Sequence, residues 1–226
     1  MILMISLIPD PAEAAALAAR AAALEWRDGR ATAGHRARAV KHNLQAVMSA
    51  PEACALASEV QALLGAQPVL RAAAWPRRFS NLIISRTGGG GHYGLHVDNA
   101  VMTAASGEAM RSDLSFTLFL SPPQDYDGGE LVIHSASGTQ DVKGNPGELV
   151  LYPSTSLHEV RPVTRGERIV CVGWIESMVP DGPAREILFD MENLRASLRA
   201  QLPAQAAGLL TLDKTIANLL RRWARP

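Results

Sequence analysis

Short apolar segments at regular spacing dominate the middle of the chain and constrain its fold more than any other feature. Five such segments lie between residues 78 and 178, at 82–86, 114–120, 130–133, 148–152 and 169–175. Clusters of glycine, proline, asparagine and aspartate separate them, with strong turn signals at Asp127-Gly128-Gly129 and Asn145-Pro146-Gly147. This texture predicts an antiparallel sandwich or barrel such as a jelly roll. No long helical pattern interrupts the segments, which argues against a parallel α/β sheet.

Helices and one strand are predicted upstream of this β-rich region. The predicted elements are a strand at 1–8, a helix from 11 to about 26, a loop with an extended piece at 30–50 and a helix at 51–64. Asp10 can cap the first helix, Pro11 fits its first turn, and Glu13 occupies the acidic position of a capping box. Gly65 and Pro68 are expected to close the second helix.

Two helices are predicted downstream of the β-rich region. Apolar residues recur at helical spacing in two stretches, at Ile187, Leu188, Met191, Leu194 and Leu198 and at Leu212, Ile216, Leu219, Leu220 and Trp223. The fold class is therefore mainly β with flanking helices (α+β). We expect an N-terminal segment at 1–77, a jelly-roll core at 78–178 and a helical appendage at 179–226. The apolar stripes of the appendage can pack on the barrel or form the interface of a homo-oligomer.

Composition excludes several classes of protein. With 226 residues, the chain is long enough to bury a sizeable core, and its 22 basic and 22 acidic residues balance. We therefore expect no nucleic-acid or membrane partner. Cys54 and Cys171 are too far apart in sequence to form a C-x-x-C motif, and Cys171 lies in an apolar run that predicts a buried thiol. The apolar start has no basic residue before it and ends at Pro9, so we expect neither a signal peptide nor a membrane span and a cytoplasmic location.

One short motif and one distant histidine carry the predicted chemistry. Tyr93-Gly-Leu-His96-Val-Asp98 contains H-x-D, and residues two apart on a strand face the same side. His158 follows the segment at 148–152 and its turn. Two histidines and one carboxylate on one face of a metal leave three coordination positions open, as in non-haem Fe(II) oxygenases. A cosubstrate and O₂ need those open positions, which a cysteine-rich site would not leave.

A buried cation is predicted near the same site. Arg168 lies ten residues after His158, at the start of the apolar run 169–175. A basic side chain inside a barrel is costly to bury without a partner, and a guanidinium suits a bidentate grip on a carboxylate. Arg165 is a rival for this role, but Arg165-Gly166 is typical of a turn.

The combined motifs resemble the bacterial PKHD-type hydroxylases, a prolyl/lysyl-hydroxylase-like branch of the iron and 2-oxoglutarate oxygenases. The matching stretches are residues 93–98, 111–115, 118–120, 126–131, 149–154, 157–158 and 162–166 with Arg168, and weaker similarity extends over nearly the whole chain. The resemblance implies a double-stranded β-helix, Fe(II) held by His96, Asp98 and His158, 2-oxoglutarate bound by Arg168, and stimulation by L-ascorbate. Family members often have a tyrosine where this chain has Thr87, which leaves the fine shape of the pocket open.

The sequence leaves the roles of several further residues open. Tyr93 lies on the strand face opposite to His96 by simple alternation, and packing is as plausible for it as lining the site. Thr87, Thr117 and Tyr152 are candidates for contacting the cosubstrate, although ordinary barrel packing is preferred for Thr117 and Tyr152. The run Gly88–Gly91 can form a lid at the mouth of the site. Arg111 and Asp113 can contact the substrate at the rim or form a surface ion pair. We expect no metal contact from the other histidines, His35, His42, His92 and His134.

The function predicted from these features is that of an Fe(II)- and 2-oxoglutarate-dependent dioxygenase. It would hydroxylate a small molecule or a peptide and release succinate and CO₂, as the resemblance implies. A non-catalytic, cupin-like ligand-binding barrel is the alternative, and a hydrolytic or isomerising metal site is a third possibility. Arg168 discriminates among them, because only a carboxylate cosubstrate explains it well.

Overall fold

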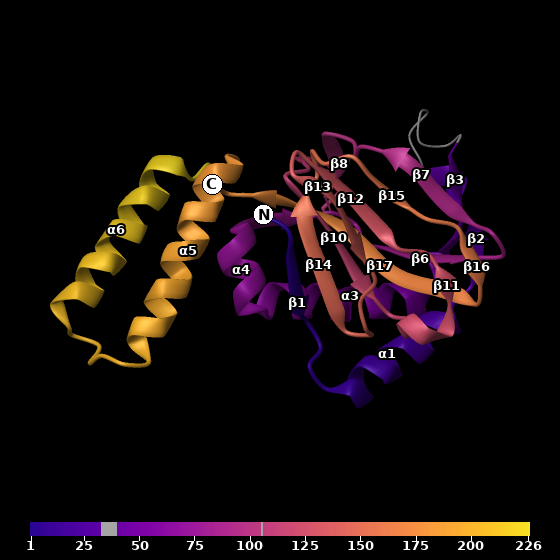
Figure 1. Ribbon diagram of the computed structural model, residues 1–226, viewed down its shortest axis with the longest axis horizontal. Helices are drawn as coiled ribbons and strands as arrows, with labels where there is room; N and C mark the ends of the chain where they lie inside the picture. Colours follow the sequence, from indigo (N-terminus) through magenta and orange to yellow (C-terminus); the bar gives the residue numbers. More distant parts are fainter. Residues whose placement is uncertain (33–39, 105) are drawn as a thin grey trace.

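Two antiparallel sheets form the centre of the protein. The computed structural model describes residues 1–32, 40–104 and 106–226 (Figure 1), so His35 lies outside the described residues. The large sheet has the order β1 (Leu3–Ser6), β14 (Glu148–Pro153), β10 (Leu114–Phe119), β17 (Glu167–Ser177), β6 (Ile83–Gly88), β4 (Leu44–Ala46) and β2 (Trp26–Asp28), and β5 (Pro76–Phe79) also pairs with β17. The small sheet has the order β13 (Gly138–Val142), β12 (Leu131–Ser135), β15 (His158–Val160), β7 (His92–His96) and β3 (Lys41–His42).

Shorter elements complete the barrel. Two two-stranded sheets pair β11 (Asp127–Gly128) with β16 (Val163–Arg165) and β8 (Val101–Thr103) with β9 (Ala109–Arg111), and η1 (Gly29–Thr32) and η2 (Pro123–Asp125) are 3₁₀ turns. Side chains from both main sheets line one cavity, so the sheets lie face to face. The predicted α+β class with a jelly roll at its centre is confirmed.

Alternation along the strands separates two cores. On β14, Leu149 and Leu151 belong to the core beneath the N-terminal helices, whereas Val150 and Tyr152 belong to an inner core with Leu131 and other residues of the small sheet. Successive strand residues point to opposite faces, so one strand serves both cores. Helices α1 (Pro11–Ala22), α3 (Pro51–Ala66) and α4 (Pro68–Ala74) supply the outer layer; in Figure 1, α1 lies below the sheets and α4 lies beside β1.

Two helix boundaries predicted from the sequence are wrong. The alanine-rich helix α1 ends at Ala22, and Trp26 already lies on β2, where it pairs with Ala46 of β4. Sheet pairing outweighs helix propensity at this point. Gly65 does not end α3, which continues to Ala66, and Pro68 begins α4 at the first helical position, where proline is tolerated.

The C-terminal helices form a separate hairpin. Helices α5 (Gly182–Arg199) and α6 (Ala207–Trp223) stand beside the barrel in Figure 1 and pack around Val179, Leu188 and Ile216. Leu194 of α5 is 51% exposed. Assembly through this hairpin and the division of the chain at residues 78 and 178 remain predictions. In the described part of the chain no single helix is long and apolar enough to cross a membrane, although α3 and α4, bent by 74° at their junction, pass that test as a pair.

One short segment crosses between the two main sheets and bears on the site. Lys41 and His42 form β3, which pairs with β7 of the small sheet, and Leu44 to Ala46 form β4, which pairs with β6 of the large sheet. The segment therefore closes one edge of the jelly roll. Because side chains alternate along an extended chain, every second residue from Lys41 faces the interior, and Lys41, Asn43 and Gln45 all line the cavity.

Candidate metal and cosubstrate site

Strand pairing brings together the three predicted metal ligands. His96 ends β7, His158 begins β15, and the two residues are direct partners in the antiparallel register. Asp98 follows β7 by two residues. The candidate ligand atoms of the three residues all lie within 4.8 Å of one another. Among the described residues, no other group of three histidines, cysteines or acids converges in this way, and neither His92 nor His134 belongs to the cluster.

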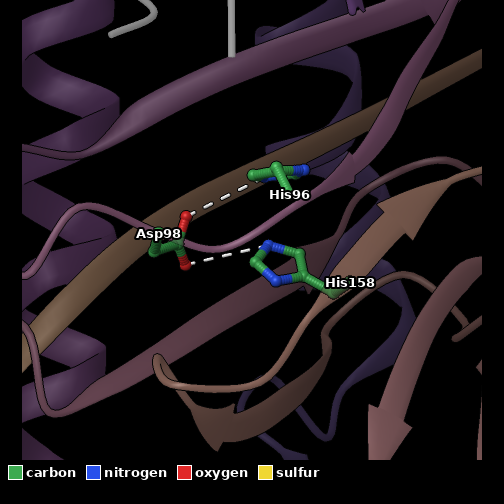
Figure 2. Close-up of side chains that lie close together, drawn as sticks. All are labelled: His96, Asp98 and His158. Carbon is green, nitrogen blue, oxygen red and sulfur yellow. Dashed lines mark ion pairs between the residues drawn. The ribbon is translucent and has the colours of Figure 1, made fainter. Parts of the chain in front are cut away.

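The two imidazoles present the same nitrogen to the centre of the cluster (Figure 2). His96 Nε2 lies 4.0 Å from Asp98 Oδ1, and His158 Nε2 lies 3.7 Å from Asp98 Oδ2. Each Nδ1 faces a backbone carbonyl instead. His96 Nδ1 lies 2.8 Å from the carbonyl oxygen of Gly94, and His158 Nδ1 lies 3.0 Å from the carbonyl oxygen of Ser156. A carbonyl only accepts hydrogen bonds, so the proton lies on Nδ1 and the lone pair on Nε2. Burial is the main cause that lowers the pKa of His96, and the neighbouring His158 is the second; both favour the neutral imidazole.

A pair of serines orients the carboxylate. Ser115 Oγ on β10 donates a hydrogen bond of 2.6 Å to Asp98 Oδ2, and Ser115 Oγ lies 2.8 Å from Ser154 Oγ. Both serines are buried. The large sheet therefore fixes a ligand that is carried by a loop of the small sheet. Neither serine was predicted from the sequence to orient a ligand, although polar residues such as Ser115 and Thr117 on one face of a buried strand require a hydrogen-bond partner.

The donor set fits a ferrous ion. Two imidazole nitrogens and one carboxylate oxygen on one side of a metal correspond to the two-histidine, one-carboxylate arrangement of non-haem iron oxygenases. Each ligand is held by a further hydrogen bond, as metal-binding side chains usually are. The cluster opens onto a cavity of about 180 Å³ lined by both sheets. Ligands from outside the protein can therefore reach the metal centre.

Arg168 lies inside this cavity, and Arg165 does not. Arg168 on β17 is only 3% exposed and lines the cavity, and its Nε has no hydrogen-bond partner in the structure. Burial lowers the pKa of this guanidinium, which reflects the cost of keeping its charge away from water. Arg165 lies on the exposed edge and pairs with Asp127 at 2.7 Å. An anion bound in the cavity would satisfy this guanidinium.

The four residues with open roles all line the cavity. Thr87 is the register partner of Arg168, and Thr117 and Tyr152 occupy neighbouring strands of the large sheet. Thr117 and Tyr152 are both buried beside the cavity, and Tyr152 also packs in the inner core, in line with the preferred packing role. Contact of either residue with the cosubstrate remains a prediction. Thr87, where the family resemblance leads us to expect a tyrosine, is the register partner of the buried guanidinium.

Tyr93 faces the site because the ladder between β7 and β15 is irregular. His158 pairs with His96, but Val160, two residues on, pairs with Tyr93, three residues back. The extra residue is a β-bulge, which reverses the alternation. The Tyr93 ring consequently stacks on His96 with centroids 3.7 Å apart. Simple alternation had placed Tyr93 on the opposite face.

The remaining candidates lie elsewhere. Arg111 Nε donates to Asp113 Oδ1 at 2.7 Å, and Asp113 Oδ2 accepts from the backbone of Ser177 at 2.8 Å, so the pair ties β9 to the end of β17 and is not among the residues lining the cavity. Gly89 and Gly90 adopt positive φ angles in the turn after β6 and line a separate surface groove. A lid role for this turn remains a prediction.

Removal of the Ser115 hydroxyl tests how the carboxylate is oriented. Ser115→Ala should weaken Fe(II) binding by about 10- to 100-fold, because the carboxylate loses its positioning hydrogen bond. Anaerobic equilibrium dialysis against Fe(II) measures the change. Ser137→Ala, in the exposed β12–β13 turn, is the matched control and should bind as the wild type does. Equal affinity in the two variants would contradict an orienting role for Ser115.

Comparison with solved structures supports the fold. A Pseudomonas putida prolyl-4-hydroxylase matches with a TM-score of 0.54 and 23% identity, covering 78% of this chain and 92% of the other. HygX from Streptomyces hygroscopicus, solved with nickel and 2-oxoglutarate bound, matches with a TM-score of 0.52 and 15% identity, covering 77% of this chain and 82% of the other. At these identities the likeness concerns the fold alone.

Sequence comparison identifies the family. The model of the 2OG-Fe(II) oxygenase superfamily matches residues 82–176, and the model of the PKHD-type hydroxylase C-terminal domain matches residues 183–225. A PKHD-type hydroxylase of Hyphomonas neptunium is 50% identical over 89% of both chains, and one of Teredinibacter turnerae is 44% identical over 100% of both. The resemblance inferred from the motifs is therefore confirmed, and the chain belongs to the PKHD-type hydroxylase family of 2-oxoglutarate- and Fe(II)-dependent oxygenases.

Proposed function

We propose that this oxygenase hydroxylates a small molecule or a peptide and releases succinate and CO₂. The observation that carries the proposal is the meeting of a His-Asp-His cluster and a buried arginine in one cavity. In the proposed reaction one atom of O₂ enters succinate and the other enters a C–H bond of the substrate. Fe(II) with 2-oxoglutarate supplies this oxidising chemistry when bound.

The residues divide into two proposed roles. His96, Asp98 and His158 hold the iron through His96 Nε2, a carboxylate oxygen and His158 Nε2, and they leave three positions for ligands that are not part of the protein. Arg168 grips the distal carboxylate of 2-oxoglutarate, and Thr117 and Tyr152, which line the same cavity, are candidates for added hydroxyl contacts. The protein then orients the cosubstrate, brings the substrate C–H bond close and excludes water.

Two further parts of the proposal come from the family and from the neighbours. Stimulation by L-ascorbate, as a reductant that keeps the iron ferrous, is expected from the family resemblance. The name of the Pseudomonas putida neighbour, a prolyl-4-hydroxylase, makes a prolyl side chain one candidate substrate. Fold and motif do not fix the target, so a wider panel of small molecules and peptides belongs in the test.

A non-catalytic barrel and a metal site of another chemistry explain the cavity less well. A cupin-like barrel without catalysis gives no reason for a buried guanidinium whose Nε lacks a partner, since such a group is costly to keep. A hydrolytic or isomerising metal site has the same difficulty. A dianionic keto acid accounts for both the metal cluster and the arginine, because it presents one group to each.

Anaerobic titration tests the proposed function. Adding 2-oxoglutarate to the Fe(II) protein should produce a weak visible metal-to-ligand band, and admitting O₂ should then form succinate, one for each 2-oxoglutarate consumed. His158→Ala should abolish both signals because the metal loses a ligand. A wild-type protein that gives neither a band nor succinate would refute the proposal, and mass analysis for an added oxygen identifies the substrate among candidates.

Arg168 and Arg165 offer a matched pair of variants. Arg168→Met should raise the 2-oxoglutarate concentration needed for half-saturation of the visible band by about 30-fold or more, because a buried charge partner is lost. Iron binding should change little, since Arg168 is not in the metal cluster. Arg165→Met removes an exposed cation and should titrate as the wild type does. The reverse pattern would show that the cosubstrate clamp had been assigned to the wrong arginine.

A further inference from the structure

The strand register places Arg168 and the metal cluster at different levels of the cavity. Alternate residues of β17, from Arg168 to Trp174, line the cavity. Trp174 is the register partner of Ser115, whose hydroxyl holds Asp98, so the metal cluster lies at the level of Trp174. Arg168 lies six residues back along the strand, which corresponds to roughly 20 Å between the two Cα atoms. The cavity therefore has an Arg168 end and a Trp174 end.

The small sheet shows the same division. Tyr93 and Val160 are register partners on one side of the two ligand histidines. Tyr93 comes just after the glycine turn, in which Gly88 pairs with Glu167, the neighbour of Arg168. Tyr93 and Val160 therefore belong to the Arg168 end, and the loop that follows Asp98 leads in the opposite direction.

This loop and strand β8 belong to the Trp174 end. Thr103 of β8 accepts a backbone hydrogen bond from Asn81 at 3.3 Å, and the neighbouring Ser80 donates its backbone N–H to the carbonyl of Trp174 at 3.0 Å. Figure 1 shows β8 and β16 toward opposite sides of the barrel. The register and the backbone contacts thus agree on the two ends.

Charge is divided unequally between the two ends. Among the described residues that line the cavity, the basic side chains are Lys41, the register partner of Tyr93, and Arg168. Both lie at the Arg168 end. Apart from the metal ligands and Ser115, the lining residues of the Trp174 end are Val97, Asn99, Met102 and Trp174. None of these four side chains ionises.

The Trp174 end is also the open end of the cavity. Val97 lines the cavity and is nevertheless 51% exposed, and Asn99 is exposed as well. At the other end, Lys41, Thr87 and Arg168 are all buried. A molecule that is larger than the cosubstrate therefore reaches the metal cluster from the Trp174 end.

Exposed apolar side chains lie next to this opening. Val97 stands between two metal ligands in the sequence, Leu157 directly precedes His158, and Val101 begins β8; all three are exposed. Exposed apolar side chains that gather beside a cavity are typical of a binding surface. Because Val97 belongs both to this surface and to the lining of the metal cavity, the molecule that covers the surface is the one that reaches the metal.

We propose that the substrate enters at the Trp174 end and presents an uncharged, apolar group to the metal, such as an aliphatic side chain or a prolyl ring. An ionised group, such as the ammonium of a lysyl side chain, would lose its hydration there and find no charged partner among the four lining residues. This inference rests on the proposed function, because it takes the cosubstrate to occupy the Arg168 end.

Anaerobic equilibrium dialysis of the Fe(II) protein, saturated with 2-oxoglutarate, tests the proposal without turnover. The probes are N-acetyl amino acid amides in two matched pairs: norleucine with lysine, and the methyl ester of glutamate with glutamate. Mass spectrometry measures the bound probe. In each pair the neutral member should bind about tenfold or more tightly than the ionised member, because only the ionised member has to lose the hydration of a charge.

Substitution of Met102 tests where the apolar group binds. Met102→Glu places a carboxylate at the Trp174 end, so it should weaken binding of the norleucine probe by about tenfold or more and make the lysine probe the tighter of the two. Met102→Leu keeps an apolar side chain of similar volume and should retain the wild-type preference. Met4→Glu, at an exposed position of β1, is the matched control and should bind every probe as the wild type does.

Several results would overturn the proposal. These are equal binding within the pairs, tighter binding of an ionised probe by the wild type, no binding of either neutral probe, or an unchanged preference in Met102→Glu. Loss of the visible band of Fe(II) and 2-oxoglutarate in Met102→Leu would also overturn it, because Met102 would then belong to the metal or cosubstrate site. Absence of the band from the wild type would refute the proposed function itself, which distinguishes the two failures.

Discussion

The pairing of β15 with β7 is the constraint on which the site depends. It sets His158 directly across from His96, and the loop after β7 returns Asp98 to the same point. Antiparallel partners lie about 4.5–5.5 Å apart at Cα, so two imidazoles in this register can reach one ion without rearrangement of the backbone. The β-bulge between the same two strands turns Tyr93 onto the His96 ring. One irregular ladder therefore fixes two ligands and the aromatic ring that covers one of them.

The large sheet supports this site from across the cavity. Ser115 of β10 holds Asp98, and Arg168 of β17 supplies the buried cation. The opposite faces of the same strands pack against α1, α3 and α4. Because each strand has one side in the outer core and the other in the cavity, packing of the helices holds the polar residues of the site in place. The crossing segment with Lys41 closes the edge between the two sheets.

Sequence patterns predicted the parts of the structure that local chemistry determines. The apolar run at 148–152 predicted β14, and the H-x-D motif with a histidine after a turn predicted the cluster that the structure brings together. Patterns failed where distant pairing decides the outcome. Trp26 follows an alanine-rich helix but joins β2 through contact with β4, and Tyr93 changes face through a bulge. Lys41 lies in a polar stretch whose burial arises only when β3 and β4 join different sheets.

The central claim is that three side chains of this chain hold one metal and leave its other positions open. Anomalous diffraction at the iron edge, from crystals grown anaerobically with Fe(II), tests it most directly. We predict a single iron peak bonded to Nε2 of His96, Nε2 of His158 and a carboxylate oxygen of Asp98, with no further ligand from the protein. A peak elsewhere, or a fourth side chain bonded to the iron, would contradict this assignment of the metal ligands.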